Sequence, residues 1–106
     1  MGDSNIAPVS VCPVERAILV IGGKWKLLVL RSLLLNGPQG YNQLLETVTK
    51  ISAKELTRNL KELSTCGLVN RAAGPSPRTT EYSLTASGKG LMPTFETLLT
   101  WGQTLL

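Results

Sequence analysis

The sequence predicts a mainly helical α+β fold, and three observations lead to this prediction. Helical apolar periodicity with start and stop signals runs through four segments between residues 12 and 66. Two alternating segments, "LVNRAA" and "TTEYSL", flank the loop "GPSPR" and predict a two-stranded hairpin. An apolar segment that opens at Thr85 predicts a last helix. The order of four helices, a hairpin and a final helix indicates a winged helix-turn-helix.

The chain is predicted to form one domain over residues 12–106, after a mobile arm over residues 1–11 that shows no periodicity. The first helix should begin at Pro13, because proline is favoured in the first helical position, and Gly22–Gly23 should end it. The helix over residues 24–35 is apolar on most sides, which predicts the central helix of the core.

Two short helices joined by a tight turn, over residues 41–48 and from Ser52 onward, predict the helix-turn-helix. Ser52, with Glu55 three residues later, is typical of a capping box at a helix N-terminus. Three leucines share one stripe of the second helix, and three basic residues lie near its opposite pole: Leu56, Leu60 and Leu63, against Lys54, Arg58 and Lys61. The leucines should pack on the helices over residues 24–35 and 41–48.

The basic pole of this helix suits the major groove of B-DNA, which admits an α-helix. Lys54, Arg58 and Lys61 are therefore candidates for contacts with bases and phosphates, although a solvated charged face would show the same pattern. Ser52 and Thr57 are further candidates, but for Ser52 the capping role alone is a sufficient explanation.

The hairpin contributes two more candidates for DNA contacts. Arg78 follows the loop of the wing and should reach a phosphate or the minor groove. Arg71, in the first strand, could contact DNA or could pair with Glu81 across the hairpin. In the helix that follows, Pro93 and two glycines should weaken or bend the first half.

One small domain cannot easily cover the apolar surfaces of its first, second and last helices. A two-fold homodimer that buries Ile18, Ile21, Leu98, Trp101 and Leu105 would account for the excess. The last helix is thus predicted to be a dimerisation helix, and the dimer would present two recognition helices to a palindromic site on double-stranded DNA.

Composition excludes several other functions. The net charge of +4 favours an anionic partner, and the chain has no histidine and only two cysteines. We therefore expect no enzyme activity, no metal site and no cofactor. No apolar run reaches the roughly 18 residues of a membrane span and no signal peptide is evident, so a cytoplasmic protein without a membrane partner is expected.

Three segments resemble the HxlR-type transcriptional regulators, winged-helix proteins related to the MarR group. They are "CPVERAILVIGGKWKLLVLRSLL", "YNQLLETVTKISAKELTRNLKELSTCGLVNR" and "EYSLTASGKGLMPTFETLLTWG", and the likeness covers about residues 12–102. The resemblance implies a homodimeric, sequence-specific DNA-binding regulator. The alternative is a winged-helix module that binds proteins and not DNA.

Cys12 could give such a regulator a response to oxidants or electrophiles. The resemblance implies this role, because some members of the family sense such compounds through a cysteine near the N-terminus. The residues themselves leave two explanations open. A helix N-terminus favours the reactive thiolate, whereas a small, partly buried side chain would equally explain Cys12.

Overall fold

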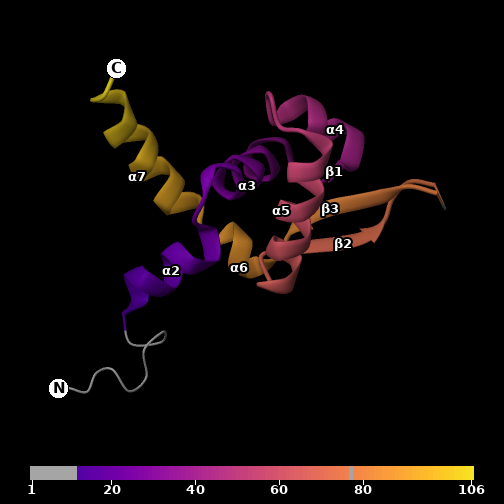
Figure 1. Ribbon diagram of the computed structural model, residues 1–106, viewed down its shortest axis with the longest axis horizontal. Coiled ribbons are helices and arrows are strands. Elements are labelled where there is room, and N and C mark those ends of the chain that lie inside the picture. The colour runs from indigo at the N-terminus through magenta and orange to yellow at the C-terminus, as the bar shows by residue number, and fades with distance from the viewer. Residues whose placement is uncertain (1–11, 77) are drawn as a thin grey trace.

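The structure, a computed structural model, describes residues 12–76 and 78–106 of the chain. Its elements are, in order, α2 (Pro13–Ile21), α3 (Lys24–Asn36), β1 (Gln39–Gly40), α4 (Tyr41–Thr47), α5 (Ala53–Thr65), β2 (Val69–Ala73), β3 (Thr80–Leu84), α6 (Ala86–Lys89) and α7 (Met92–Gln103). Figure 1 shows α3, α4 and α5 at the centre, the β2–β3 hairpin projecting to one side, and α2 and α7 projecting to the other. The predicted winged helix-turn-helix is confirmed. The predicted arm over residues 1–11 lies outside the described residues.

The N-terminus of α5 is capped as the sequence predicts, but only in part. The backbone N–H of Glu55 donates to the Ser52 hydroxyl at 3.1 Å, which satisfies one of the free amides of the first turn. The second half of the predicted capping box is wrong. The Glu55 carboxylate instead accepts a hydrogen bond from the Arg58 guanidinium one turn later.

The hairpin belongs to a three-stranded antiparallel sheet with the order β1-β3-β2. Val69 pairs with Leu84 at the base of the hairpin, and Ala73 pairs with Thr80 near its tip. The strand β1 was not predicted, and the two-stranded hairpin is corrected in this respect. Its two residues lie within turn-forming sequence and are too few to show alternation, yet Gln39 pairs with Tyr82 on the outer edge of β3.

The hydrophobic core lies between α3, α4, α5 and the base of the sheet. Leu30, Leu44, Leu56 and Leu63 are fully buried, and Leu60 is 2% exposed. The predicted packing of the leucine face of α5 against α3 and α4 is confirmed. Burial of side chains of this size contributes about 1.5–3 kcal/mol each, so these helices hold the recognition helix firmly in place.

A small buried polar network fixes β1 to α3 and α4. The Gln39 side-chain amide donates to the Ser32 hydroxyl at 3.0 Å and to the Ser32 carbonyl at 3.1 Å. The Thr47 hydroxyl donates to the Gln39 side-chain carbonyl at 2.8 Å. Gln39 is buried away from water. These hydrogen bonds therefore provide the partners that its buried amide group needs.

The predicted last helix is divided into two helices, α6 and α7. The break falls between Gly90 and Leu91, close to Pro93, which agrees with the predicted weakness of this segment. Gly88 allows α6 to approach the end of α5, because a Cβ atom there would lie 2.4 Å from the Leu68 carbonyl oxygen. Beyond the break, α7 runs away from the core.

Neither α2 nor α7 contains a buried residue. Both helices nevertheless carry large apolar side chains on their surfaces, including Val14, Ile18, Leu19, Leu98, Leu99, Trp101 and Leu105. Within residues 12–76 and 78–106, no helix is both long enough and apolar enough to cross a membrane.

Candidate nucleic-acid interface

The outward face of α5 carries the residues that the sequence predicts for DNA contact. Ser52, Lys54, Thr57, Arg58 and Lys61 are all exposed. Lys54, Arg58 and Lys61 lie on the side of α5 opposite its buried leucines, Thr57 lies on the flank beside Tyr41, and Ser52 is the N-cap residue. Their arrangement follows from the helical period, because residues three and four apart lie on one face. The structure thus brings Lys54, Thr57, Arg58 and Lys61 together on one exposed side of α5, and leaves Ser52 at the helix cap.

This surface is less uniformly basic than the sequence suggests. The Arg58 guanidinium pairs with the Glu55 carboxylate and lies 3.6 Å from a carboxylate oxygen of Glu62. The hydrogen bond to Glu55 and its negative charge raise the pKa of Arg58 above its ordinary value. Lys26 of α3 donates to Glu62 at 3.0 Å, and this hydrogen bond, with the nearby charges of Lys26 and Arg58, lowers the pKa of Glu62.

Lys54 and Lys61 differ from Arg58 in their surroundings. Within the described residues, neither lysine has a carboxylate within 4.0 Å. An ammonium group on a flexible stem without an acidic neighbour is available to a phosphate or a base edge without first leaving a partner. These two lysines are therefore the most available positive charges on the recognition helix.

Thr57 has a partner outside its own helix. The Tyr41 hydroxyl, at the start of α4, lies 2.9 Å from the Thr57 hydroxyl and donates to the Ala53 carbonyl, also at 2.9 Å. Tyr41 thereby connects α4 to the first two turns of α5. Tyr41 was not predicted as a site residue.

Lys61 and Arg71 line the same hollow between α5 and the sheet. Its volume is about 460 Å³, and its wall is completed by Tyr41, Thr57, Leu60, Ser64, Thr65 and Tyr82. The alternative pairing of Arg71 with Glu81 is wrong. Arg71 lies opposite Tyr82 in the sheet whereas Glu81 lies opposite Ala72, so the two side chains leave opposite faces.

Arg78 lies where the wing meets the start of α4. It lines a second hollow, also of about 460 Å³, with Gly40, Tyr41, Asn42, Gln43, Thr79, Thr80 and Tyr82. Tyr41 and Tyr82 line both hollows, which places them next to each other on the surface. The two hollows therefore connect the wing arginines with Thr57 and Lys61 of α5. We call this region, with the exposed Lys54 and Arg58 of the same helix, the α5–wing surface. It comprises Lys54, Thr57, Arg58, Lys61, Arg71 and Arg78 with the two tyrosines.

The HxlR-like helix-turn-helix model matches residues 20–106 of the chain. The chain belongs to this family. A relative from Methanothermobacter thermautotrophicus, an HTH-type transcriptional regulator that is itself uncharacterized, is 40% identical over 104 residues, which are 97% of this chain and 76% of the relative. The protein is thus a helix-turn-helix transcriptional regulator.

Solved structures agree with this assignment. A protein from Porphyromonas gingivalis W83 assigned to the MarR family of transcriptional regulators has a TM-score of 0.81 at 30% identity, covering 92% of this chain and 95% of that one. The quinone-bound form of YodB from Bacillus subtilis has a TM-score of 0.75 at 31% identity, covering 88% of this chain and 99% of that one. Both similarities extend over most of the chain.

In this HxlR-like chain, Cys12 is the N-cap residue of α2 and is half-buried. The Cys12 carbonyl accepts the first backbone hydrogen bond of the helix, from Arg16 at 3.0 Å. Cys66, at the other end of the domain, is exposed just after α5. The position of Cys12 at a helix N-terminus is confirmed, but its accessibility is lower than that of Cys66.

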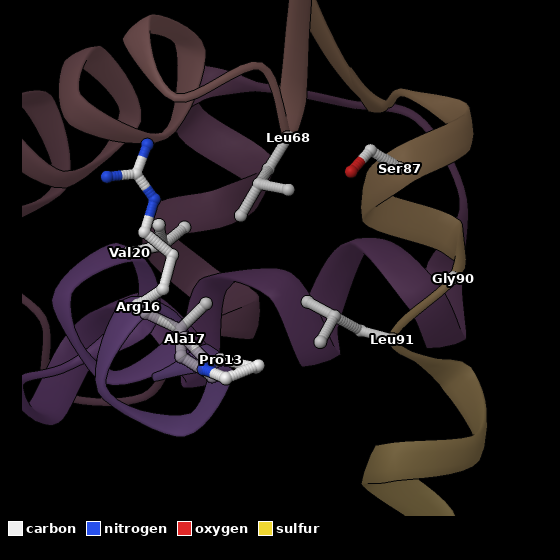
Figure 2. Close-up of a pocket in the computed structure, with 9 residues that line it drawn as sticks. Pro13, Arg16, Ala17, Val20, Leu68, Ser87, Gly90 and Leu91 are labelled. Carbon is white, nitrogen blue, oxygen red and sulfur yellow. The ribbon is translucent and has the colours of Figure 1, made fainter. Parts of the chain in front are cut away.

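A pocket of about 410 Å³ lies between α2 and the α6–α7 junction (Figure 2). Figure 2 shows Leu68 and Leu91 on one side of it and the α2 residues on the other, with the Ser87 hydroxyl facing the space. The lining residues are Pro13, Arg16, Ala17, Val20, Ile21, Leu68, Ser87, Gly90 and Leu91. Because Pro13 follows Cys12 directly, this largely apolar pocket opens next to the thiol-bearing residue.

The predicted dimer residues divide into two groups. Ile18, Leu98, Trp101 and Leu105 are exposed on α2 and α7, with Trp101 61% exposed. Ile21, in contrast, is partly buried against the chain's own core. Val14, Leu19 and Leu99 are also exposed on these helices, although they were not among the predicted dimer residues.

The site residues that the sequence did not indicate are the tyrosines and Asn42 beside the wing. Tyr41 and Tyr82 look like core aromatics in the sequence, and only the tertiary fold brings their rings to the surface of α5. The described residues contain no group of three His, Cys, Asp or Glu side chains able to hold a metal ion.

Proposed function

We propose that this HxlR-like protein is a cytoplasmic, homodimeric and sequence-specific regulator that binds a palindromic operator in double-stranded DNA. The observation that carries the proposal is the α5–wing surface. Lys61 of the recognition helix and Arg71 of the wing line one hollow, Arg78 lines the neighbouring hollow, and Lys54 is exposed in the first turn of the same helix. A helix in the major groove with a wing over the adjacent backbone would use this surface in full.

Side-chain chemistry suggests which residues of this surface contact bases and which contact phosphates. Lys54 and Thr57, in the first turns of α5, are proposed to lie nearest the base edges. Ser52, the cap residue, is proposed to lie beside them. Arg58 is proposed to exchange its pairing with Glu55 for a bidentate contact with guanine. The remaining cations, at positions 61, 71 and 78, are proposed to hold phosphates.

The homodimer is proposed from the apolar surfaces of α2 and α7. An exposed tryptophan together with several leucines and one isoleucine on two projecting helices would be an aggregation hazard in a monomer. A two-fold axis through these helices would cover them and would place the two α5 helices on one face of the duplex. The half-sites should then lie about 10–10.5 base pairs apart, or a multiple of this.

Selection of binding sites from random-sequence duplexes tests the proposal. The expected result is enrichment of a palindrome, followed by a footprint on that sequence which is lost when Lys54, Arg58 and Lys61 are replaced by alanine in folded protein. Sedimentation should show a dimer at micromolar concentration. Failure to enrich any sequence would contradict the proposal and would favour the protein-interaction module instead.

We also propose that Cys12 makes DNA binding sensitive to oxidants or electrophiles. Cys12 is the N-cap residue of α2, and the apolar pocket beside Pro13 could hold an aromatic electrophile. Limited alkylation with mass spectrometry tests this proposal. Cys12 should be modified before Cys66 although Cys66 is the more exposed, and equal or reversed rates would contradict the sensing role.

A further inference from the structure

The hydroxyl groups of Tyr41 and Thr57 form a pair whose protons can be counted. The Tyr41 hydroxyl lies 2.9 Å from the Ala53 carbonyl oxygen and 2.9 Å from the Thr57 hydroxyl oxygen. A phenol has one proton, and a carbonyl oxygen can only accept. The Tyr41 proton therefore goes to Ala53, and Thr57 must supply the proton of the second bond.

Three other threonines within helices donate their hydroxyl protons to their own helix backbone. Thr65, Thr97 and Thr100 each donate to the backbone carbonyl four residues earlier in their own helix. For Thr57 the corresponding carbonyl is that of Ala53, which already accepts from Tyr41. In the described part of the chain, Tyr41 thus turns the Thr57 proton away from the backbone of α5 and toward α4.

Because its proton is used in the bond to Tyr41, the Thr57 hydroxyl can only accept a hydrogen bond from a DNA group in the major groove. Phosphate oxygens are acceptors too, so Thr57 cannot hold the DNA backbone directly. In the major groove the amino groups of adenine (N6) and cytosine (N4) are donors, whereas guanine O6 and thymine O4 are acceptors. An outward-facing acceptor at this place distinguishes adenine or cytosine from guanine or thymine on the strand that it faces.

We propose that Thr57 reads one amino group in each half-site and that Tyr41 is the positioning residue that fixes the direction of its proton. This inference depends on the proposed function, since it names the chemistry of one base contact on the α5–wing surface. Tyr41 itself need not touch DNA. Its contribution is to the orientation of a hydroxyl on the neighbouring helix.

Binding-site selection with three variants tests the inference. Wild-type protein should select adenine or cytosine at one position of each half-site. Thr57→Val should lose this preference and bind the best site about five- to tenfold more weakly, the usual range for one hydrogen bond. Tyr41→Phe should weaken the same preference with Thr57 intact. The matched control Thr65→Val, which removes a hydroxyl from the same hollow, should leave it unchanged.

A base analogue provides the second arm of the experiment. In the selected duplex, the base is replaced by the analogue that lacks only the amino group. Wild-type protein should then lose the same factor in affinity as Thr57→Val loses on the normal duplex, and Thr57→Val should lose nothing further. Thr57→Ser, which keeps the hydroxyl, should retain the preference. Circular dichroism melting curves establish that each variant is folded.

The possible failures are distinguishable. If wild-type protein selects a palindrome but tolerates the loss of the amino group, or if folded Thr57→Val and Tyr41→Phe proteins select the same base, the inference is wrong and DNA binding stands. If wild-type protein selects no sequence, the proposed function and the inference fail together.

Discussion

The helix-turn-helix and the two projecting helices treat their apolar side chains in opposite ways. In α3, α4 and α5, six leucines are buried against one another, and Leu60 for example is only 2% exposed. In α2 and α7 no residue is buried, and Leu99 is 63% exposed. The same residue type therefore stabilises the fold in one region and remains available for assembly in the other.

This difference indicates that the two regions depend on different equilibria. The free energy that holds α5 in place comes from contacts within one chain, and it does not change with protein concentration. The free energy that would order α2 and α7 comes from a second chain in the proposed dimer, and by mass action it does change with concentration. Variants in the two regions should therefore be separable by varying the concentration of protein.

The largest expected effect is that of Leu60→Ala. Removing a fully packed leucine side chain from the core should lower the free energy of unfolding by about 2–5 kcal/mol. Urea unfolding at several protein concentrations measures this loss, which should be the same at each. The matched substitution Leu99→Ala should have an effect that grows with concentration. A smaller loss of unfolding free energy for Leu60→Ala than for Leu99→Ala would contradict the distinction between the two regions.

Trp101→Ala should act on assembly alone. Aromatic side chains at the centre of interfaces often dominate binding, and we expect dimerisation to weaken by about 2–4 kcal/mol. Analytical ultracentrifugation measures the dimer dissociation constant, with Thr100→Ala as a control on the same helix. An unchanged dimer would contradict the proposed interface, whatever the effect on DNA binding.

Arg58→Ala should have the opposite pattern to Trp101→Ala, because it should alter DNA binding and leave the dimer intact. We expect a loss of about 1–3 kcal/mol on the preferred site and relaxed discrimination at one base pair per half-site. Arg58→Lys keeps the charge without the planar fork, so it should relax discrimination with little loss of non-specific affinity. Equal losses for Arg58→Lys on all sequences would assign Arg58 to a phosphate.

The smallest expected effect is a pH dependence confined to the helix-turn-helix. The pKa of Glu62 in the folded protein lies below its ordinary value of 4.5, mainly because of Lys26. Its contribution to stability is therefore present above about pH 4.5 and is lost as the pH falls through the folded pKa. Unfolding midpoints between about pH 7 and about pH 3 should show a smaller acid loss for Glu62→Gln than for wild type. Glu96→Gln in α7 should match wild type.

Much of the fold could be predicted because each helix carries its own boundary signals. Pro13, the Gly22–Gly23 pair and Ser52 mark helix ends through local backbone chemistry, which does not require knowledge of the rest of the chain. The strand β1 could not be predicted, because two residues become a strand only when β3 lies beside them. Its stabilising network, centred on Gln39, depends likewise on side chains from α3 and α4.

The candidate site was predictable to a similar extent. The helical period alone places Lys54, Arg58 and Lys61 on one face. The period does not reveal that acids one turn away hold Arg58, although Glu55 and Glu62 stand three and four residues from it. The role of Tyr41 could not be predicted either, because its hydroxyl meets Thr57 only through the angle between α4 and α5.

The segment that leads from the wing into α7, residues 85–91, is short, and its start is anchored by hydrogen bonds. The Thr85 hydroxyl donates to the Gly67 carbonyl at 2.7 Å, and the Thr85 N–H donates to the Leu68 carbonyl at 3.0 Å, so the start of α6 is fixed to the end of the recognition helix. In the proposed dimer, residues 85–91 act as a pivot for α7, a lever about 18 Å long. A rotation of about 10° at this pivot shifts the far end by about 3 Å, close to the ~3.4 Å rise of one base pair. A slight change of angle in this link would thus move the far end of α7 by about the length of one base-pair step.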